Sequence, residues 1–226
     1  ESDPKKRQRY LTFVIIGGGP TGVELSGALG EIAHDTLKHD FRRINPGDAS
    51  IFLVEAAPRL LMSFPEKLSD RAGKSLARLG VTVLTGHRVT AITSDRVEVS
   101  AGEKSLSIEA ATVVWSAGVR AYKLGETLVD GHREHLDRIG RVMVNPDLTV
   151  PGHPEIFVVG DLANYPHQTG APLPGTCPVA MSQGRFVADS ITRRLHNKPS
   201  RQFHYFNKGE LAVIGRAAAV RRRASS

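Results

Sequence analysis

A glycine-rich break in an apolar run is the first feature of this sequence that could do chemistry. It lies in FVIIGGGPTGVELSGALGEIA, residues 13–33, and its closely spaced glycines are Gly17, Gly18, Gly19 and Gly22. The spacing Gly-x-Gly-x-x-Gly is typical of loops that hold a dinucleotide pyrophosphate. The first glycine allows a tight turn, the second lets the backbone approach the pyrophosphate, and the third lets a helix pack closely on a strand. A helix that begins at Pro20 and Thr21 would direct its free N–H groups toward that anion.

An acid follows this loop at the end of the next apolar run. Glu55 closes the segment 50–55, where a carboxylate can accept hydrogen bonds from both hydroxyls of an adenosine ribose. The same charge would repel the 2′-phosphate of NADP, so the sequence favours NADH. Arg59 could argue for NADP, but it lies beyond Pro58, away from the place where that phosphate would bind.

A second acid, Glu24, lies in the first turn of the helix that follows the glycines. One interpretation is that it complements the helix dipole. The other is that it points away from the pyrophosphate, toward the nicotinamide, where it would position the ring or carry a proton. Glu24 is therefore the candidate catalytic residue.

A third acid ends a late apolar run. Gly160 and Asp161 close the segment 156–159, and a terminal acid there can reach the ribityl hydroxyls of a flavin. A helix expected from Thr176 would direct its N-terminus toward the flavin ring, where its dipole would stabilise negative charge on the reduced cofactor.

The elements that must position these residues indicate an α/β protein. Strands are predicted at 11–16, 50–55, 81–84 and 112–115, with helices at about 20–41 and 65–79. Alternating strands and helices predict a parallel, doubly wound, Rossmann-like sheet in a three-layer domain. Short segments at 89–92, 96–99 and 105–108 predict an antiparallel β-meander. Further strands are expected at 141–144 and 156–159, and a last helix at about 176–196.

Composition limits the classes of protein that remain. The 226 residues contain one cysteine, Cys177, which excludes a disulfide framework and indicates a reducing compartment. No apolar window is long enough for a membrane span, and the basic residues 4–7 lead directly into the first strand with no signal-peptide pattern. Residues 193–226 hold nine bases and one acid, which indicates either a solvated end or contact with an anionic membrane face. The basic tract lacks interleaved aromatics, so no nucleic-acid partner is expected.

Two other chemistries are not favoured. The segment His132–His135 holds two histidines and Glu134, but it does not match a zinc motif, and we interpret it as a solvated loop with no metal. No Gly-x-Ser-x-Gly sequence is present, which argues against a hydrolase.

Four segments, taken in order, resemble the type II NADH:quinone oxidoreductases, a family of flavoproteins with two dinucleotide-binding domains related to the pyridine nucleotide-disulfide oxidoreductases. They are VIIGGGPTGVELSGALGEIA, VVWSAGVRA, IFVVGDLANY and LPGTCPVAMSQGRFVADSI. The resemblance implies an NADH domain at 9–118, the closing part of an FAD domain at 119–195, and the start of a C-terminal region at 196–226.

The resemblance also implies roles for individual residues. Ala117 and Gly118 would line the NAD side where the two cofactors meet, and the acid matching Glu24 would lie near the nicotinamide. The residues expected at the flavin are Gly160, Asp161, Pro178, Val179 and Ala180.

Two departures from the family pattern change what we expect of the isolated chain and of its electron acceptor. The N-terminal FAD half, with its own glycine motif, is missing, so the isolated chain is expected to be inactive and to hold FAD weakly. Pro178 and Ser182 stand where the family has glutamines, so the electron acceptor is left open between a quinone and a similar compound.

The resulting hypothesis is an FAD-dependent NADH dehydrogenase that moves a hydride from NADH to flavin and electrons on to the acceptor. Its full-length form is expected in the cytoplasm, peripheral on the inner face of the cell membrane, and a homodimer is left open. The alternative is an NAD(H)-binding redox-sensing module with little turnover.

Overall fold

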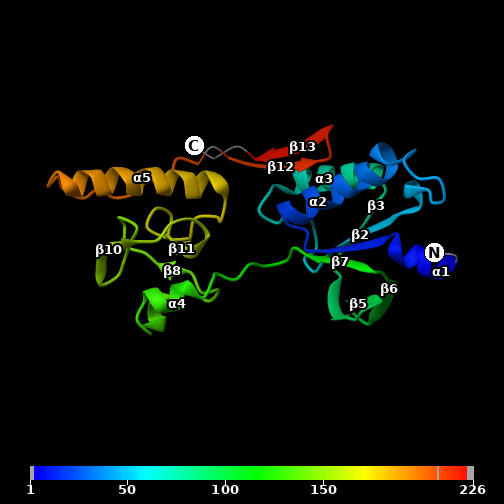
Figure 1. The fold of residues 1–226 in the computed structure, drawn as a ribbon, viewed down its shortest axis with the longest axis horizontal. Coiled ribbons are helices and arrows are strands. Elements are labelled where there is room, and N and C mark those ends of the chain that lie inside the picture. The colour runs from blue at the N-terminus through cyan, green and yellow to red at the C-terminus, as the bar shows by residue number, and fades with distance from the viewer. Residues whose placement is uncertain (1–2, 208, 223–226) are drawn as a thin grey trace. The chain divides into compact units, whose positions relative to one another are not determined.

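The computed structural model describes residues 3–207 and 209–222. The remaining residues, some of which belong to the predicted segment 196–226, lie outside this description. The chain divides into two compact units, and Figure 1 labels their helices and strands. The first unit comprises 1–118 and 208–226, and the second comprises Val119–Asn207.

A parallel sheet forms the centre of the first unit and confirms the predicted α/β class. Its strands are β1 (Thr12–Ile16), β2 (Ser50–Glu55), β3 (Val81–Thr85) and β7 (Thr112–Trp115), in the order β3-β2-β1-β7. Ile16 pairs with Val54 on one side and with Trp115 on the other. The carboxyl ends of the strands therefore lie along one edge, where ligands of such sheets bind.

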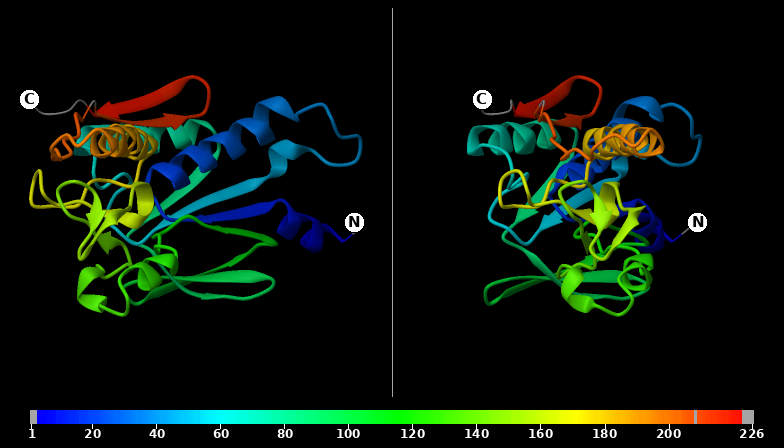
Figure 2. Two further views of the ribbon diagram at one scale, coloured as in Figure 1. Left: turned by 60° about the vertical axis from the view of Figure 1, so that its left-hand side comes forward. Right: turned by 90° about the vertical axis from the view of Figure 1, so that its left-hand side faces the viewer.

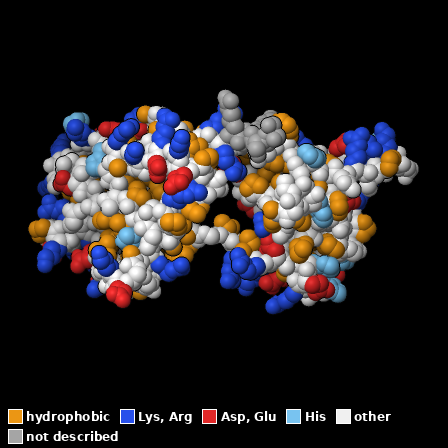
Figure 3. Space-filling view, turned by 180° about the vertical axis from the view of Figure 1, so that it is seen from behind, with side chains coloured by type: hydrophobic (Ala, Val, Ile, Leu, Met, Phe, Trp, Pro, Cys, Tyr) orange, Lys and Arg blue, Asp and Glu red, His pale blue; other side chains and the backbone are white. Residues whose placement is uncertain are grey.

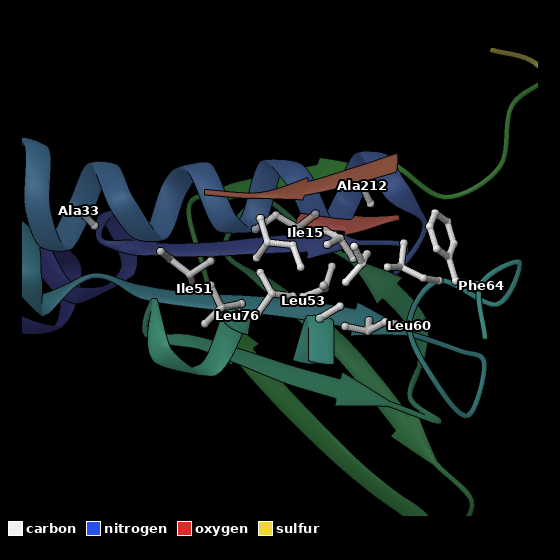
Figure 4. Packing of buried hydrophobic residues seen from close by; sticks show 14 residues of the cluster. Ile15, Ala33, Ile51, Leu53, Leu60, Phe64, Leu76 and Ala212 are labelled. Carbon is white, nitrogen blue, oxygen red and sulfur yellow. The ribbon is translucent and has the colours of Figure 1, made fainter. Parts of the chain in front are cut away.

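Helices cover one face of this sheet and the β-meander covers the other. The helices are α2 (Pro20–Glu31) and α3 (Glu66–Arg78), and the meander strands are β4 (Arg88–Ile92), β5 (Arg96–Ala101) and β6 (Lys104–Glu109). Alternate residues of a strand point to opposite faces. Accordingly Ile15 and Leu53 pack with Leu76 of α3, whereas Val14 and Val54 belong to a separate cluster with the meander. Figure 4 shows Ile15, Ile51 and Leu53 extending from the sheet into the helix-side core.

A C-terminal hairpin, which the sequence did not predict, packs on these helices. Its strands β12 (Glu210–Ile214) and β13 (Ala218–Arg222) contact α2 and α3 and place Ala212 and Ile214 in the same core (Figure 2). A Cβ on Gly27 of α2 would lie 2.9 Å from the backbone nitrogen of Gly215. Only a residue without a side chain allows the hairpin to approach α2 so closely.

Two predicted boundaries near the N-terminus are wrong. Residues 4–7 do not lead directly into a strand, because Pro4–Tyr10 forms helix α1, which Asp3 caps by accepting from the backbone of Lys5. The predicted helix 20–41 ends earlier, with α2 passing into a π-helix at Ile32–Thr36. The helix ends there because the Leu37 N–H bonds the Ile32 carbonyl, five residues back, at 2.9 Å, and Leu37 leaves the helical conformation with φ −95° and ψ 5°. Leu37, Phe41 and Ile44 then line an apolar cavity at the start of the sheet.

The second unit is built from short elements around its own core. They are α4 (Leu124–Leu128), β8 (Val142–Met143), β9 (Thr149–Val150), β10 (His153–Phe157), β11 (Ala163–Asn164) and α5 (Cys177–Leu195). Helix α5 confirms the predicted helix, whereas the strand expected at 156–159 begins at His153 and ends at Phe157. It starts earlier because His153 and Phe157 pair with β9 in an antiparallel arrangement.

Asp137 joins the loop before β8 to β11. Its Oδ1 accepts from the backbone of Ile139 at 3.0 Å and Arg141 at 2.9 Å, and its Oδ2 accepts from Arg141 Nε at 2.7 Å and Asn164 Nδ2 at 2.9 Å. Desolvation by itself would raise the pKa of this carboxyl, but the hydrogen bonds from Arg141, Ile139 and Asn164 together lower the pKa below its usual value.

This network predicts a pH-dependent contribution to stability. A carboxyl with a lowered folded-state pKa stabilises the fold above its unfolded pKa of about 4, and that stabilisation is lost as the pH falls through the folded value. We expect Asp137→Asn to lower the free energy of unfolding at pH 7 by about 2 kcal/mol and to reduce the loss of stability below about pH 4. Denaturant unfolding across this pH range measures both effects. Asp189→Asn, which removes an exposed 3.6 Å ion pair with Arg201, is the control and should change little.

Candidate functional site

The glycine turn follows the carboxyl end of β1, beside the residues that follow the neighbouring strand β7. Gly17 has a φ of +112°, and a Cβ at this position would lie 2.8 Å from the backbone of Ala117. The Ser116 N–H donates to the Ile16 carbonyl at 2.8 Å, and the Ser116 hydroxyl donates to the same oxygen at 2.8 Å. Two features therefore require glycine at position 17: its positive φ and the close approach of the Ala117 backbone.

Gly22 and Gly19 have opposite surroundings. A Cβ on Gly22 would lie 1.8 Å from the carbonyl oxygen of Gly17, so the helix can pack against the turn only with glycine there. A Cβ on Gly19 would meet no heavy atom of the described chain within 4 Å. Gly19 caps α2 without a side-chain hydrogen bond, and Pro20 follows it. The first turn of α2 thus faces open space, where its backbone N–H groups can receive an anion.

Glu55 lies beside this turn, and its carboxylate accepts hydrogen bonds from two backbone N–H groups. Its Oε2 accepts from Gly18 N at 2.5 Å, and its Oε1 accepts from Ala57 N at 2.6 Å. The side chain is half-buried. An ionised carboxylate has about four acceptor positions, so each oxygen keeps capacity for a ligand hydroxyl while the existing bonds hold its orientation.

Arg59 does not offer a free guanidinium near Glu55. Its Nη1 donates to Phe64 O at 2.8 Å and to Ser69 Oγ at 2.7 Å, and its Nη2 donates to Met62 O at 3.0 Å. These bonds hold the loop after β2 and occupy the side chain that could otherwise bind a phosphate.

The prediction that Glu24 lies in the first turn of the helix is wrong, because α2 begins at Pro20 and its first turn holds no acidic residue. Glu24 is exposed on α2, and the structure gives it a partner that the sequence did not reveal. Its Oε1 accepts from the backbone nitrogen of Val213 in β12 at 3.1 Å. Glu31, two turns further along α2, accepts from Arg216 N at 2.7 Å. Both acids thus attach the hairpin to α2, while the predicted place of Glu24 near a nicotinamide stays a prediction.

The Gly160–Asp161 corner lies in the second unit, against the N-terminus of α5. A Cβ on Gly160, whose φ is +69°, would lie 3.4 Å from Ala180 Cβ. A Cβ on Gly175 would lie 3.0 Å from Asp161 Oδ1. The structure therefore brings Gly160 and Asp161 together with Ala180 and the adjoining Pro178 and Val179. Ala117 and Gly118 lie with the glycine turn of the first unit, and Gly118 has a φ of +68°.

Sequence reasoning missed two residues that shape these sites. Ser116 fixes the turn from β7, and Gln183 bonds the backbone of Gly160 from α5. The signals were present but weak: Ser116 precedes the Ala117–Gly118 pair, and Gln183 follows Ser182 in the last of the four segments that resemble the family.

His132, Glu134 and His135 carry ligand-type atoms within 4.8 Å of one another. His132 Nδ1 and Glu134 Oε1 lie 2.8 Å apart, with both side chains largely exposed. Because hydrogen bonding within a solvated loop accounts for this contact, we assign no metal to these residues.

In the described part of the chain, no helix combines the length and apolar character that crossing a membrane requires.

Comparisons with known proteins identify the family and the fold. The family model described as "Pyridine nucleotide-disulphide oxidoreductase" matches residues 2–184. Type II NADH:quinone oxidoreductase Ndh of Mycobacterium tuberculosis is 41% identical over 97% of this chain and 47% of its own length. The type II NADH:quinone oxidoreductase of Staphylococcus saprophyticus is 31% identical over 95% of this chain and 52% of its own length.

A solved structure shares the fold. NDH2 from Plasmodium falciparum in complex with NADH superposes with a TM-score of 0.79 at 17% identity, over 98% of this chain and 59% of that one. The chain spans about half the length of the curated relatives it matches.

The two glycine environments predict different effects of adding one methyl group. Gly22→Ala forces a Cβ onto the Gly17 carbonyl and should lower the free energy of unfolding by about 2 kcal/mol or more. Gly19→Ala meets no atom and keeps an allowed backbone, with φ −72° and ψ −179°, so it should change stability by less than about 1 kcal/mol. Denaturant unfolding of both variants tests this, and equal destabilisation would contradict the proposed packing role of Gly22.

Proposed function

Because the chain belongs to the pyridine nucleotide-disulphide oxidoreductase family and is a homologue of the type II NADH:quinone oxidoreductases, we propose that the full-length protein oxidises NADH through FAD. The first unit binds NADH, and the second unit provides part of the FAD site. Electrons then pass to a quinone or a similar acceptor.

The observation that carries this proposal is the contrast between Gly19 and its neighbours. Gly17 and Gly22 are closed in by backbone atoms, whereas the space at Gly19 is open at the N-terminus of α2. A pyrophosphate can approach the backbone there, receive N–H hydrogen bonds and interact with the positive end of the helix dipole. The NADH-binding residues proposed are Gly17, Gly18, Gly19, Pro20, Thr21, Gly22, Glu55, Ala117 and Gly118.

The preference for NADH over NADPH is assigned to Glu55. Its carboxylate is held by Gly18 and Ala57 at the end of β2 and keeps free lone pairs for ribose hydroxyls. A 2′-phosphate would meet this negative charge, and Arg59 is engaged in its own loop and unable to offset the repulsion.

Glu24 is proposed as the residue near the nicotinamide. Its side chain is exposed just beyond the first turn of α2, and the hydrogen bond from Val213 N leaves acceptor capacity on the carboxylate. The same contact means that removing Glu24 also loosens the hairpin, so its substitution affects structure and chemistry together.

The flavin contact is assigned to Gly160, Asp161, Pro178, Val179 and Ala180. Asp161 is exposed and makes no hydrogen bond within the described residues, so its oxygens are free to accept from ribityl hydroxyls. The N-terminus of α5 adjoins it and can stabilise developing negative charge. These residues would bind and orient FAD, which would supply a hydride acceptor that can pass electrons on singly or in pairs.

A quinone acceptor is proposed from the names of the relatives, and a peripheral position on the cytoplasmic face of the membrane follows from it. Charge supports this position. Lys67, Arg71, Lys74 and Arg78 lie at i, i+4, i+7 and i+11 of α3, which places them on one helix face, and they line one groove with Asp70. Figure 3 shows numerous Lys and Arg side chains over the surface of both units. Anionic headgroups attract such cations.

The Glu55 assignment predicts a change in cofactor preference. Glu55→Gln replaces one acceptor oxygen with an NH2 group, which cannot accept a hydrogen bond. NADH affinity should therefore fall about tenfold, the loss of one charge-assisted hydrogen bond. The difference between NADH and NADPH affinities should also narrow, because the repelling charge is gone. Fluorescence titration with both nucleotides measures this, with Glu103→Gln on the exposed meander turn as control. Unchanged affinities for both would show that Glu55 does not bind the ribose.

The proposed activity is tested on the full-length protein saturated with FAD. We expect steady-state NADH oxidation with a soluble quinone at a kcat within the usual range of roughly 1–10³ per second, with Gly19→Ala reducing kcat/KM for NADH. Turnover below about one per minute, against that range, would contradict the enzyme proposal and favour a redox-sensing module. A colourless native preparation would contradict the flavin assignment.

A further inference from the structure

Gln183 is a buried polar residue with one well-defined contact. It lies in α5, its exposed fraction is 1%, and its Oε1 accepts the backbone N–H of Gly160 at 2.6 Å. Among the buried polar residues of the second unit it is the one that reaches the Gly160–Asp161 corner. This contact joins two segments that the sequence separates by 23 residues.

The corner needs such a contact because its backbone is unusual. Gly160 has a φ of +69°, which favours glycine, and it begins a single 3₁₀ turn, Gly160–Leu162. Without an acceptor, its N–H would face the buried side of α5 unpaired, at a cost of about 1–3 kcal/mol. Gln183 supplies that acceptor.

The face of α5 that carries Gln183 also packs against the corner. Val179 and Ala180 precede Gln183 by four and three residues, so all three side chains lie on one side of the helix. Val179 is buried, and Ala180 Cβ lies 3.4 Å from the position that a Cβ on Gly160 would take. The hydrogen bond therefore fixes the corner relative to the N-terminal turn of α5.

We propose that Gln183 is a positioning residue that holds the Gly160–Asp161 corner against α5, so that the free Asp161 carboxylate can accept hydrogen bonds from the flavin. The assignment rests on the proposed function, because the ligand of Asp161 is taken to be FAD. Gln183 does not contact the ligand in this assignment and acts through the backbone of Gly160.

A neutral carboxamide suits this position. It accepts the Gly160 N–H without placing a second negative charge in the interior next to Asp161, where an unpaired carboxylate would be costly. A methionine has nearly the same length and shape but no strong acceptor, and a glutamic acid keeps an acceptor oxygen. These two substitutions separate the hydrogen bond from the packing.

The experiment uses the full-length flavoprotein and compares Gln183→Met, Gln183→Glu and Gln168→Met. Gln168 is the matched control, since it also bonds backbone in the second unit, donating to Tyr205 O at 2.9 Å and accepting from Tyr205 N at 3.0 Å. Hydrogen exchange of the peptide containing Gly160 reports the contact itself. The dissociation constant of FAD reports its consequence, and the dissociation constant of NADH reports the other site.

We expect Gln183→Met to accelerate exchange at Gly160 and to weaken FAD binding about tenfold, with NADH binding unchanged. Gln183→Glu keeps an acceptor oxygen, so exchange at Gly160 should stay close to that of wild type, whereas its added charge beside Asp161 should weaken FAD binding. Gln168→Met should leave both Gly160 exchange and FAD binding as in wild type.

The outcomes separate this assignment from the proposed function. A wild-type protein that binds no FAD would overturn both. A wild type that binds FAD normally, together with a Gln183→Met variant that binds it equally well or shows unchanged exchange at Gly160, would overturn the role of Gln183 alone. Equal loss in Gln183→Met and Gln168→Met would also overturn it, because general destabilisation would then explain the effect.

Discussion

The close contact between Gly22 and the Gly17 carbonyl is the constraint on which the first unit depends. It sets the distance between the end of β1 and the start of α2, and it leaves no room for even one methyl group. Once α2 is held there, Val23 and the helix-side residues of β1 and β2 can form one core. The same constraint leaves the first turn of α2 open at Gly19, so close packing and the candidate anion site arise from one arrangement of backbone.

The sequence predicted those parts of the fold that depend on local pattern. The parallel strands and the meander were confirmed because alternation and β-branched runs identify strands, and glycine spacing identifies the turn after β1. The predictions for residues 4–7 and for the end of the helix at 20–41 were wrong, because a cap at Asp3 starts α1 and the π-helix Ile32–Thr36 ends the run that begins with α2. The site residues stay predictions, although the structure places the glycines and Glu55 side by side.

Contacts between distant segments could not be predicted from one sequence. The bonds from Glu24 to Val213 and from Glu31 to Arg216 span 189 and 185 residues, and no local periodicity encodes them. The hairpin they hold adds Ala212 and Ile214 to the core of the first unit. Glu24, which the sequence suggested as a catalytic residue, thus also has a structural partner, Val213, that only the folded chain reveals.

In each unit a side chain accepts a hydrogen bond from a glycine N–H at the candidate site, but the acceptor is a carboxylate at Gly18 and a neutral amide at Gly160. This difference in charge suits the ligands proposed for the two units. Glu55 fixes Gly18 with a carboxylate, and under the proposed function the same charge would repel a 2′-phosphate, so one group would both hold the loop and select the nucleotide. Gln183 uses a neutral amide to fix Gly160, which leaves Asp161 as the charge available at that corner. A carboxylate in place of Gln183 would compete with Asp161 for the positive end of α5. Separating the holding group from the binding group keeps the Asp161 charge for the ligand.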